Sequence, residues 1–215
     1  MRTFSLDNIN LYRITHIDNI PHILQYGVTH RHSSNANPNY VAIGDTSLIE
    51  CRSNKVVAVG NNKVSLGEYI PFYFGVRMPM LFVIQLGGNF VPSPVHPDDL
   101  VYVVVSLKEL IKRDSNDCIF SDGHAMECLS SFYDMSEISR LPSIIDWESV
   151  LCGKWSGDGI PTDVKRKKQA EFLVGHDVPV ECVVGFVCHS DVASMRLQSF
   201  GIPQEKIKVS PKSYY

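Results

Sequence analysis

The order of apolar and polar positions near the start of the chain predicts a strand followed by a short helix. Residues 11–16 (LYRITH) alternate between apolar and polar side chains, as in a β-strand that is buried on one face. Asp18 then suits the N-cap of a helix over residues 19–26, with Pro21 in its first turn and Gly27 at its end. We therefore expect a β–α unit at the N-terminal end of the fold.

Further along the chain, strand signals outnumber helix signals. Aromatic and β-branched residues dominate seven runs that are predicted as strands, at 69–74, 80–84, 100–105, 119–121, 170–174, 183–187 and 207–209. Helices are expected at 46–52, 107–113 and 191–200, and loops at 31–40 and 144–164. The sum is a single strand-dominated α+β domain over residues 1–215.

Composition limits the class of protein further. The chain has 215 residues, of which 44% are apolar and 20% are charged, as in an ordinary globular protein. No apolar run approaches the roughly 18 residues of a membrane span, and the first residues lack the apolar stretch of a signal peptide. We therefore expect a cytoplasmic protein with no membrane segment. The six cysteines form no Cys-x-x-Cys pair, which argues against a metal site or a disulfide scaffold.

The charge balance constrains any nucleic-acid partner. Because the net charge is −3, such a partner would have to be held by a local basic patch and not by the overall field. One run qualifies as a candidate patch, Lys165, Arg166, Lys167 and Lys168, although a charge run is more often a solvated face.

Three residues are candidates for catalysis. Glu171 places a carboxylate inside an apolar strand, where glutamate is rare, although a half-exposed strand face would also accept it. Arg52 has a planar fork that suits a diphosphate or a carboxylate, with a helix-surface arginine as the ordinary alternative. His124 follows an Asp-Gly turn that could present it for proton transfer. The chain has neither a Gly-x-Gly-x-x-Gly nor a Walker-A pattern, so a Rossmann or P-loop fold is not expected to bind a nucleotide here.

Four blocks in register carry a resemblance to a known family. They are YRITHIDN at 12–19, YIPFYF at 69–74 with PML at 79–81, FSDGHA at 120–125, and KQAEFLV at 168–174. In their order and spacing they resemble the DarT family, DNA-targeting ADP-ribosyltransferase toxins of bacterial toxin–antitoxin pairs. The resemblance extends from about Tyr12 to the end of the chain.

The resemblance implies an ADP-ribosyltransferase fold, with a split, strand-rich core around an NAD⁺ cleft and short helices at the periphery. It places the catalytic glutamate at Glu171 and the catalytic arginine at Arg52, which follows Ile43-Gly44-Asp45 in the chain. Its cofactor-binding residues fall on Arg13, Thr15, His16, Asn19, Gly44, Arg52 and Tyr73. Its DNA-binding residues fall on His124, Trp155, Lys165, Arg166, Lys167 and Lys168.

The implied reaction moves ADP-ribose from NAD⁺ to a guanine or thymine of single-stranded DNA and releases nicotinamide. The stretch 39–45 favours the guanine-modifying branch. A monomer with no metal is expected, together with a cognate antitoxin that is a macrodomain-like ADP-ribosyl glycohydrolase. Two alternatives remain open: transfer to RNA or protein or simple NAD⁺ hydrolysis, and a nucleic-acid-binding module with an inactive cleft.

Overall fold

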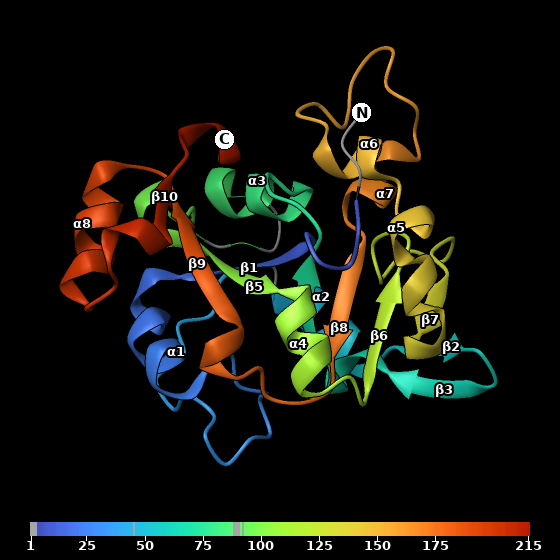
Figure 1. The fold of residues 1–215 in the computed structure, drawn as a ribbon. Helices are drawn as coiled ribbons and strands as arrows, with labels where there is room; N and C mark the ends of the chain where they lie inside the picture. Colours follow the sequence, from blue (N-terminus) through green and yellow to red (C-terminus); the bar gives the residue numbers. More distant parts are fainter. Residues whose placement is uncertain (1–3, 45, 88–90, 92) are drawn as a thin grey trace.

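The computed structural model describes residues 4–44, 46–87, 91 and 93–215. An eight-stranded sheet crosses its centre in the order β10-β9-β5-β1-β4-β8-β6-β7 (Figure 1). Those strands are β1 (Asn10–His16), β4 (Ile70–Tyr73), β5 (Leu100–Ser106), β6 (Cys118–Ser121), β7 (Phe132–Asp134), β8 (Glu171–Val174), β9 (Val183–Cys188) and β10 (Ile207–Val209). A separate hairpin consists of β2 (Val56–Val59) and β3 (Asn62–Ser65).

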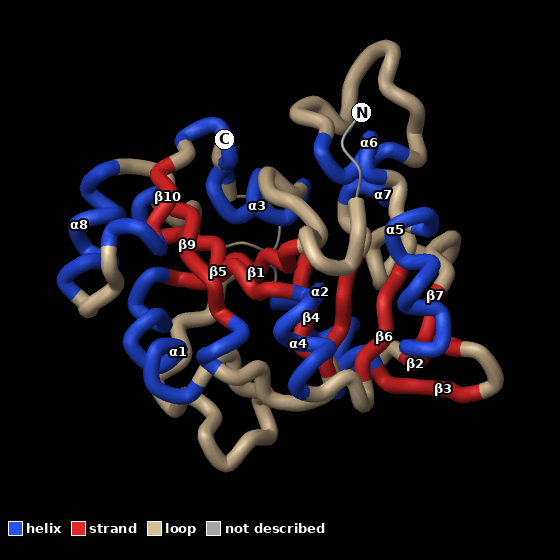
Figure 2. Tube along the Cα trace, viewed as in Figure 1, coloured by secondary structure: helices blue, strands red, loops and turns tan. Residues whose placement is uncertain are grey.

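Short helices surround the strands (Figure 2). They are α1 (Ile20–Tyr26), α2 (Thr46–Asn54), α3 (Pro79–Leu86), α4 (Leu107–Arg113), α5 (Leu141–Ile144), α6 (Trp147–Leu151), α7 (Val164–Lys168) and α8 (Asp191–Ser199). This arrangement confirms the expected mixed, strand-rich core with peripheral helices. In the described part of the chain, no helix is both long enough and apolar enough to span a bilayer.

The sheet is split between β1 and β4. On one side β1 pairs with β5 along all seven of its residues, whereas on the other it meets β4 at one register pair, Tyr12 opposite Tyr73. Arg13 bridges this junction, because its Nη1 donates a hydrogen bond of 3.0 Å to the carbonyl of Pro71. The two halves of the sheet therefore share one junction beside Tyr73.

The two faces of the sheet are packed differently. One face rests on a single large core that includes Phe72, Phe120 and Phe172. The opposite face carries two smaller clusters, one around Tyr73 and the other around Leu173. Since side chains alternate along a strand, Glu171 shares the second face with Leu173 and lies opposite Tyr73 in the β4–β8 register. The catalytic candidate thus lies on the face with the divided core.

Several elements differ from the sequence-based expectation. The predicted strand 80–84 is wrong, because these residues belong to α3, where Pro79 occupies the first turn. The predicted loop 144–164 is partly helical and contains α6, whose N-cap Asp146 accepts a hydrogen bond from the N–H of Ser149. The hairpin β2–β3 and the short β7 were not predicted.

Candidate active site

Glu171 is buried on the split face, with 1% of its side chain exposed. Its Oε1 accepts a hydrogen bond of 2.9 Å from the backbone N–H of Ala125. Its Oε2 lies 2.8 Å from Nη2 of Arg52, which extends from the last turn of α2. A buried carboxylate requires such partners, since the free-energy cost of desolvating an unpaired charge is large.

Some donor and acceptor atoms of the Arg52–Glu171 pair have no hydrogen-bond partner within the described part of the chain. In the described part of the chain, Nε and Nη2 of Arg52 and Oε2 of Glu171 are buried without a well-aligned hydrogen-bond partner. The 2.8 Å contact between them is therefore an ion pair whose N–H groups point elsewhere. Buried polar atoms without partners are rare in folded proteins. Two donors and one acceptor at one point fit a ligand that offers both an anion and a hydroxyl, as the diphosphate and ribose of NAD⁺ do.

Tyr73 and His124 lie within the electrostatic field of this pair. Burial, reinforced by the charge of Glu171, raises the pKa of Tyr73, so its hydroxyl stays protonated. Burial lowers the pKa of His124; Glu171 opposes this shift and Arg52 adds to it. His124 is therefore neutral near pH 7 and able to accept a proton or a hydrogen bond.

The loop 121–131 connects β6 to this site. Ser121 Oγ accepts a hydrogen bond of 3.3 Å from the N–H of Glu171 and donates one of 2.6 Å to the carbonyl of Gly123. The turn is thereby tied to β8, and it places Ala125 against the carboxylate. Sequence reasoning missed the backbone donor of Ala125, because a main-chain role leaves no signal in side-chain identity. The Asp-Gly turn that precedes His124 was the available hint.

The predicted cofactor-binding residues lie in different surroundings. Tyr73 lies beside Glu171, and Gly44 adopts a left-handed conformation with φ of +99°. Thr15 and Asn19, in contrast, are each 1% exposed. Asn19 donates to Thr15 Oγ1 at 3.0 Å and to the carbonyl of Val41 at 2.9 Å, and it accepts from the N–H of Val41. The polar groups of this pair hold the segment around Val41, and their contact with NAD⁺ stays a prediction.

Two further predicted residues, His16 and Arg13, have partners within the protein. His16 caps the 3-10 turn after β1, where its Nδ1 accepts from the N–H of Asp18 at 3.2 Å. Arg13 bonds the carbonyl of Pro71 across the split and lies on the face opposite Tyr12. Asp45, part of the segment used to favour guanine, lies outside the described residues.

The four cations of the expected basic patch, at 165–168, do not share one exposed surface. Lys168 is 1% exposed, and its ammonium donates to the carbonyls of Val76, Val150 and Cys152 at 3.4, 3.0 and 2.7 Å. Burial lowers the pKa of Lys168. The ammonium of Lys168 is thus used within the protein, and the DNA contact predicted for it stays a prediction without structural support.

The other cations of the run differ in their surroundings. Arg166 is ion-paired to Asp163 and Asp122, and Lys167 lies 3.2 Å from a carboxylate oxygen of Asp146. Lys165 is exposed and lies 5.7 Å from the ring centre of Trp155. The Nε1 of Trp155 donates to the hydroxyl of Tyr215 at 2.5 Å. The expectation that Lys165 and Trp155 contact DNA stays a prediction.

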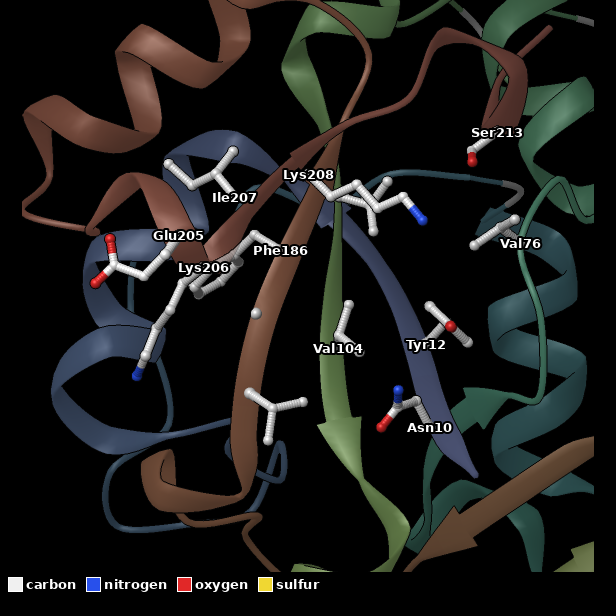
Figure 3. A pocket seen from close by; sticks show the side chains of 13 residues that line it. Asn10, Tyr12, Val76, Val104, Phe186, Glu205, Lys206, Ile207, Lys208 and Ser213 are labelled. Carbon is white, nitrogen blue, oxygen red and sulfur yellow. The ribbon is translucent and has the colours of Figure 1, made fainter. Parts of the chain in front are cut away.

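A hollow of about 330 Å³ lies on the half of the sheet that contains β1 and β5 (Figure 3). Its walls come from β1, β5, β9 and β10, and they include Tyr12, Val104 and Lys208. The hollow is not lined by Glu171, Arg52 or His124. Of the two places, only the buried pair combines a carboxylate with an opposed guanidinium.

Fold and site together define an ADP-ribosyltransferase, with a split sheet that holds a buried glutamate beside an arginine. A family model described as "ssDNA thymidine ADP-ribosyltransferase, DarT" matches residues 12–215. The chain therefore belongs to the DarT family, which confirms the resemblance seen in the sequence. It is a DNA ADP-ribosyltransferase, an enzyme class whose donor of ADP-ribose is NAD⁺.

Individual relatives agree with this membership. A DNA ADP-ribosyl transferase of Escherichia coli O127:H6 is 28% identical over 190 residues, which are 88% of this chain and 84% of that protein. A transferase–glycohydrolase fusion protein of Thermosipho africanus is 33% identical over 186 residues, 86% of this chain and 44% of the fusion. The structure of Thermus sp. 2.9 DarT with ADP-ribosylated single-stranded DNA superposes with a TM-score of 0.81 and 26% identity, covering 100% of this chain and 99% of that one.

Proposed function

We propose that this enzyme transfers ADP-ribose from NAD⁺ to thymidine in single-stranded DNA, with Glu171 as its catalytic carboxylate and Arg52 as the residue that orients it. The observation that carries the proposal is the buried Arg52–Glu171 pair, which has two donors and one acceptor free of hydrogen bonds. A structural ion pair would be expected to use these atoms internally.

The reaction requires charge stabilisation at the ribose. When the bond between C1′ and the nicotinamide nitrogen breaks, its electron pair leaves with nicotinamide, and C1′ becomes positively charged. Glu171 stabilises that charge, and its Oε2 accepts a hydrogen bond from a ribose hydroxyl. Arg52 offers Nε and Nη2 to the diphosphate, which a planar fork binds better than a point charge does.

The acceptor base must lose a proton as its ring nitrogen bonds to C1′. In our proposal that proton passes to Glu171, which lies buried at the reacting centre. His124 is neutral, since burial lowers its pKa, and it accepts a hydrogen bond from the base or relays the proton outward. Lys165 and Trp155 contact the DNA beside the base, the first at a phosphate and the second by stacking.

Thymidine replaces guanine as the first choice of acceptor. The family model is described by thymidine modification, whereas the guanine preference rested on the stretch 39–45, whose Asp45 is outside the described residues. Both bases present a ring N–H beside a carbonyl, so either one can supply the proton that the carboxylate removes.

In the cell, we propose that the chain acts as a single-domain, monomeric cytoplasmic toxin. Its partner would be a glycohydrolase that removes ADP-ribose from DNA. The Thermosipho africanus relative supports this pairing, since its name describes both activities in one polypeptide.

Mass spectrometry of nucleosides tests the proposal. Purified enzyme is incubated with NAD⁺ and single-stranded oligonucleotides that contain either thymine or guanine as the only reactive base, and the DNA is then digested. We expect ADP-ribosyl-thymidine from the wild type and a rate lower by about 10²–10³ for Glu171→Gln. Glu181→Gln, an exposed carboxylate on another segment, is the matched control.

Each other product pattern contradicts part of the proposal. Label on guanine alone overturns the choice of base, and the absence of label from both oligonucleotides overturns DNA as the substrate. Free ADP-ribose without any labelled acceptor indicates a hydrolase. Unchanged activity in Glu171→Gln removes that residue from catalysis, and DNA binding without turnover supports the inactive binding module.

A further inference from the structure

The side chain of Arg166 connects several segments inside the protein through hydrogen bonds. Its side chain is 13% exposed, and its guanidinium forms a fork with Asp163, with Nε 2.6 Å from Oδ1 and Nη2 3.1 Å from Oδ2. The remaining nitrogen, Nη1, donates to Asp122 Oδ1 at 2.9 Å and to Ser130 Oγ at 3.3 Å. One side chain of α7 therefore forms hydrogen bonds with both ends of the loop 121–131.

A backbone hydrogen bond adds to these side-chain contacts. The carbonyl of Arg166 accepts a hydrogen bond of 2.9 Å from the N–H of His124. Asp122 Oδ1, besides binding Arg166, accepts from the N–H of Ser131 at 3.0 Å and so closes the loop on itself. Gly123 is in direct contact with the guanidinium, since a Cβ at that position would lie 2.4 Å from Nη1. No larger residue fits at Gly123 while Arg166 holds its place.

The loop 121–131 supplies the hydrogen bond that Glu171 receives from Ala125, two residues after Gly123. It also carries His124, whose pKa responds to the charges of both Glu171 and Arg52. The position of the catalytic carboxylate thus depends on a loop whose own position depends on Arg166. A loss of about 1 Å in placement can cost roughly 10²-fold in rate even when the changed residue touches no substrate.

We propose that Arg166 is a positioning residue for Glu171, acting through the loop 121–131, and not a DNA contact as the basic run suggested. This inference rests on the proposed role of Glu171. Arginine is required because the bidentate contact with Asp163 leaves Nη1 free for Asp122, an arrangement that the single ammonium of lysine cannot reproduce.

Steady-state kinetics of two variants test the inference. Arg166→Lys keeps the charge but loses the fork, and Asp122→Asn weakens the link between Nη1 and the loop. For both we expect kcat to fall about tenfold or more, while KM for NAD⁺, Kd for single-stranded DNA and its salt dependence stay within about twofold of wild type. Arg140→Lys is the matched control, because Arg140 forms an exposed ion pair with Glu137 elsewhere on the surface.

The outcomes separate the possible roles. Weaker DNA binding with a flatter salt dependence and an unchanged kcat would make Arg166 a phosphate contact and overturn the inference. If Arg166→Lys fails to fold in a thermal-unfolding control, Asp122→Asn decides alone, and a wild-type kcat in that variant overturns the inference. The Glu171→Gln variant tests the proposed function separately in the same assay. If that variant is fully active, the proposed function is wrong, whatever the result for Arg166.

Discussion

At the scale of single residues, the Arg52–Glu171 pair is better explained by chemistry than by stability. Removing two charges from water costs several kcal/mol, which a pair regains only with good geometry and full hydrogen bonding. Here three of the atoms involved lack aligned partners, so the pair is incomplete without a ligand. This incompleteness is what a site prepared for a bound dinucleotide requires.

Arg52→Lys should therefore lose most activity although the charge is retained. The lysine ammonium can neutralise Glu171 but cannot bind a diphosphate through two nitrogens at once. We expect kcat/KM for NAD⁺ to fall by about tenfold or more, measured by nicotinamide release. Arg113→Lys, also in the last turn of a short helix, should leave the rate unchanged. Full activity in Arg52→Lys would reject the fork-like clamp.

A second residue-scale prediction concerns His124 and pH. Its folded-state pKa is below the ordinary histidine value of 6.5, because burial disfavours the charged ring. Above about pH 6.5 the neutral ring contributes to stability, and this contribution is lost as the pH falls through the folded-state pKa, because the unfolded chain binds the proton first. We expect the stability of wild type relative to His124→Gln to decline as the pH is lowered below 6.5, measured by urea unfolding. If the stability of wild type relative to His124→Gln instead rises as the pH is lowered, the lowered pKa is contradicted.

The residues that carry chemistry were easier to predict than their partners. Glu171, Arg52 and His124 were singled out by residue type, and the structure brings the three together. The four cations at 165–168 were treated alike, because consecutive cations look equivalent in a sequence, although the structure gives them different surroundings. On a helix, successive side chains point in different directions, about 100° apart, so one cation reaches solvent while another is buried.

At the scale of elements, α3 and α7 show where pattern reasoning fails. The run 80–84 is apolar and β-branched enough to resemble a strand, but a short apolar run does not distinguish a strand from a buried helix. In the structure Leu81 and Ile84 are buried three residues apart, while Phe82 and Val83 are exposed, which is helical spacing. Pro79 in the first turn was the sequence signal for the helix.

Helix α7 is short, so its anchoring should depend on Lys168. The ammonium of Lys168 connects the segment after β4 to the end of α6 through three carbonyls. Lys168→Ala leaves those carbonyls without their donor and should lower the free energy of unfolding by about 1–3 kcal/mol. Lys165→Ala, in the same helix but exposed, should change it by less than about 0.5 kcal/mol. Equal effects of the two substitutions in urea denaturation would contradict the anchoring role.

At the scale of the whole molecule, the split sheet brings distant segments to one point. Arg52, Tyr73, His124 and Glu171 come from four segments, and two of them meet because β4 and β8 pair in register at the junction. The sequence predicted most of these strands, but not the order in which they pair, since long-range pairing is decided by packing of the whole domain. The family resemblance supplied the split core that the strand signals alone could not.

The burial of the Arg52–Glu171 pair predicts a strong preference for unpaired DNA. The side chain of Glu171 is 1% exposed and that of Arg52 17%, so an acceptor base has to enter the protein for its ring nitrogen to meet the carboxylate. In a duplex that nitrogen is hidden by pairing and stacking, and extruding the base costs a few kcal/mol. Since about 1.4 kcal/mol corresponds to tenfold, we expect duplex DNA to react about 10²-fold or more slowly than the same strand alone.

A duplex with a mismatch at the target thymine should react at an intermediate rate, because less free energy is needed to expose the base. Initial rates on these three substrates at one NAD⁺ concentration test the prediction. Equal rates on paired and unpaired thymine would mean that the base reacts without entering the site, which would contradict a catalytic role for the buried carboxylate.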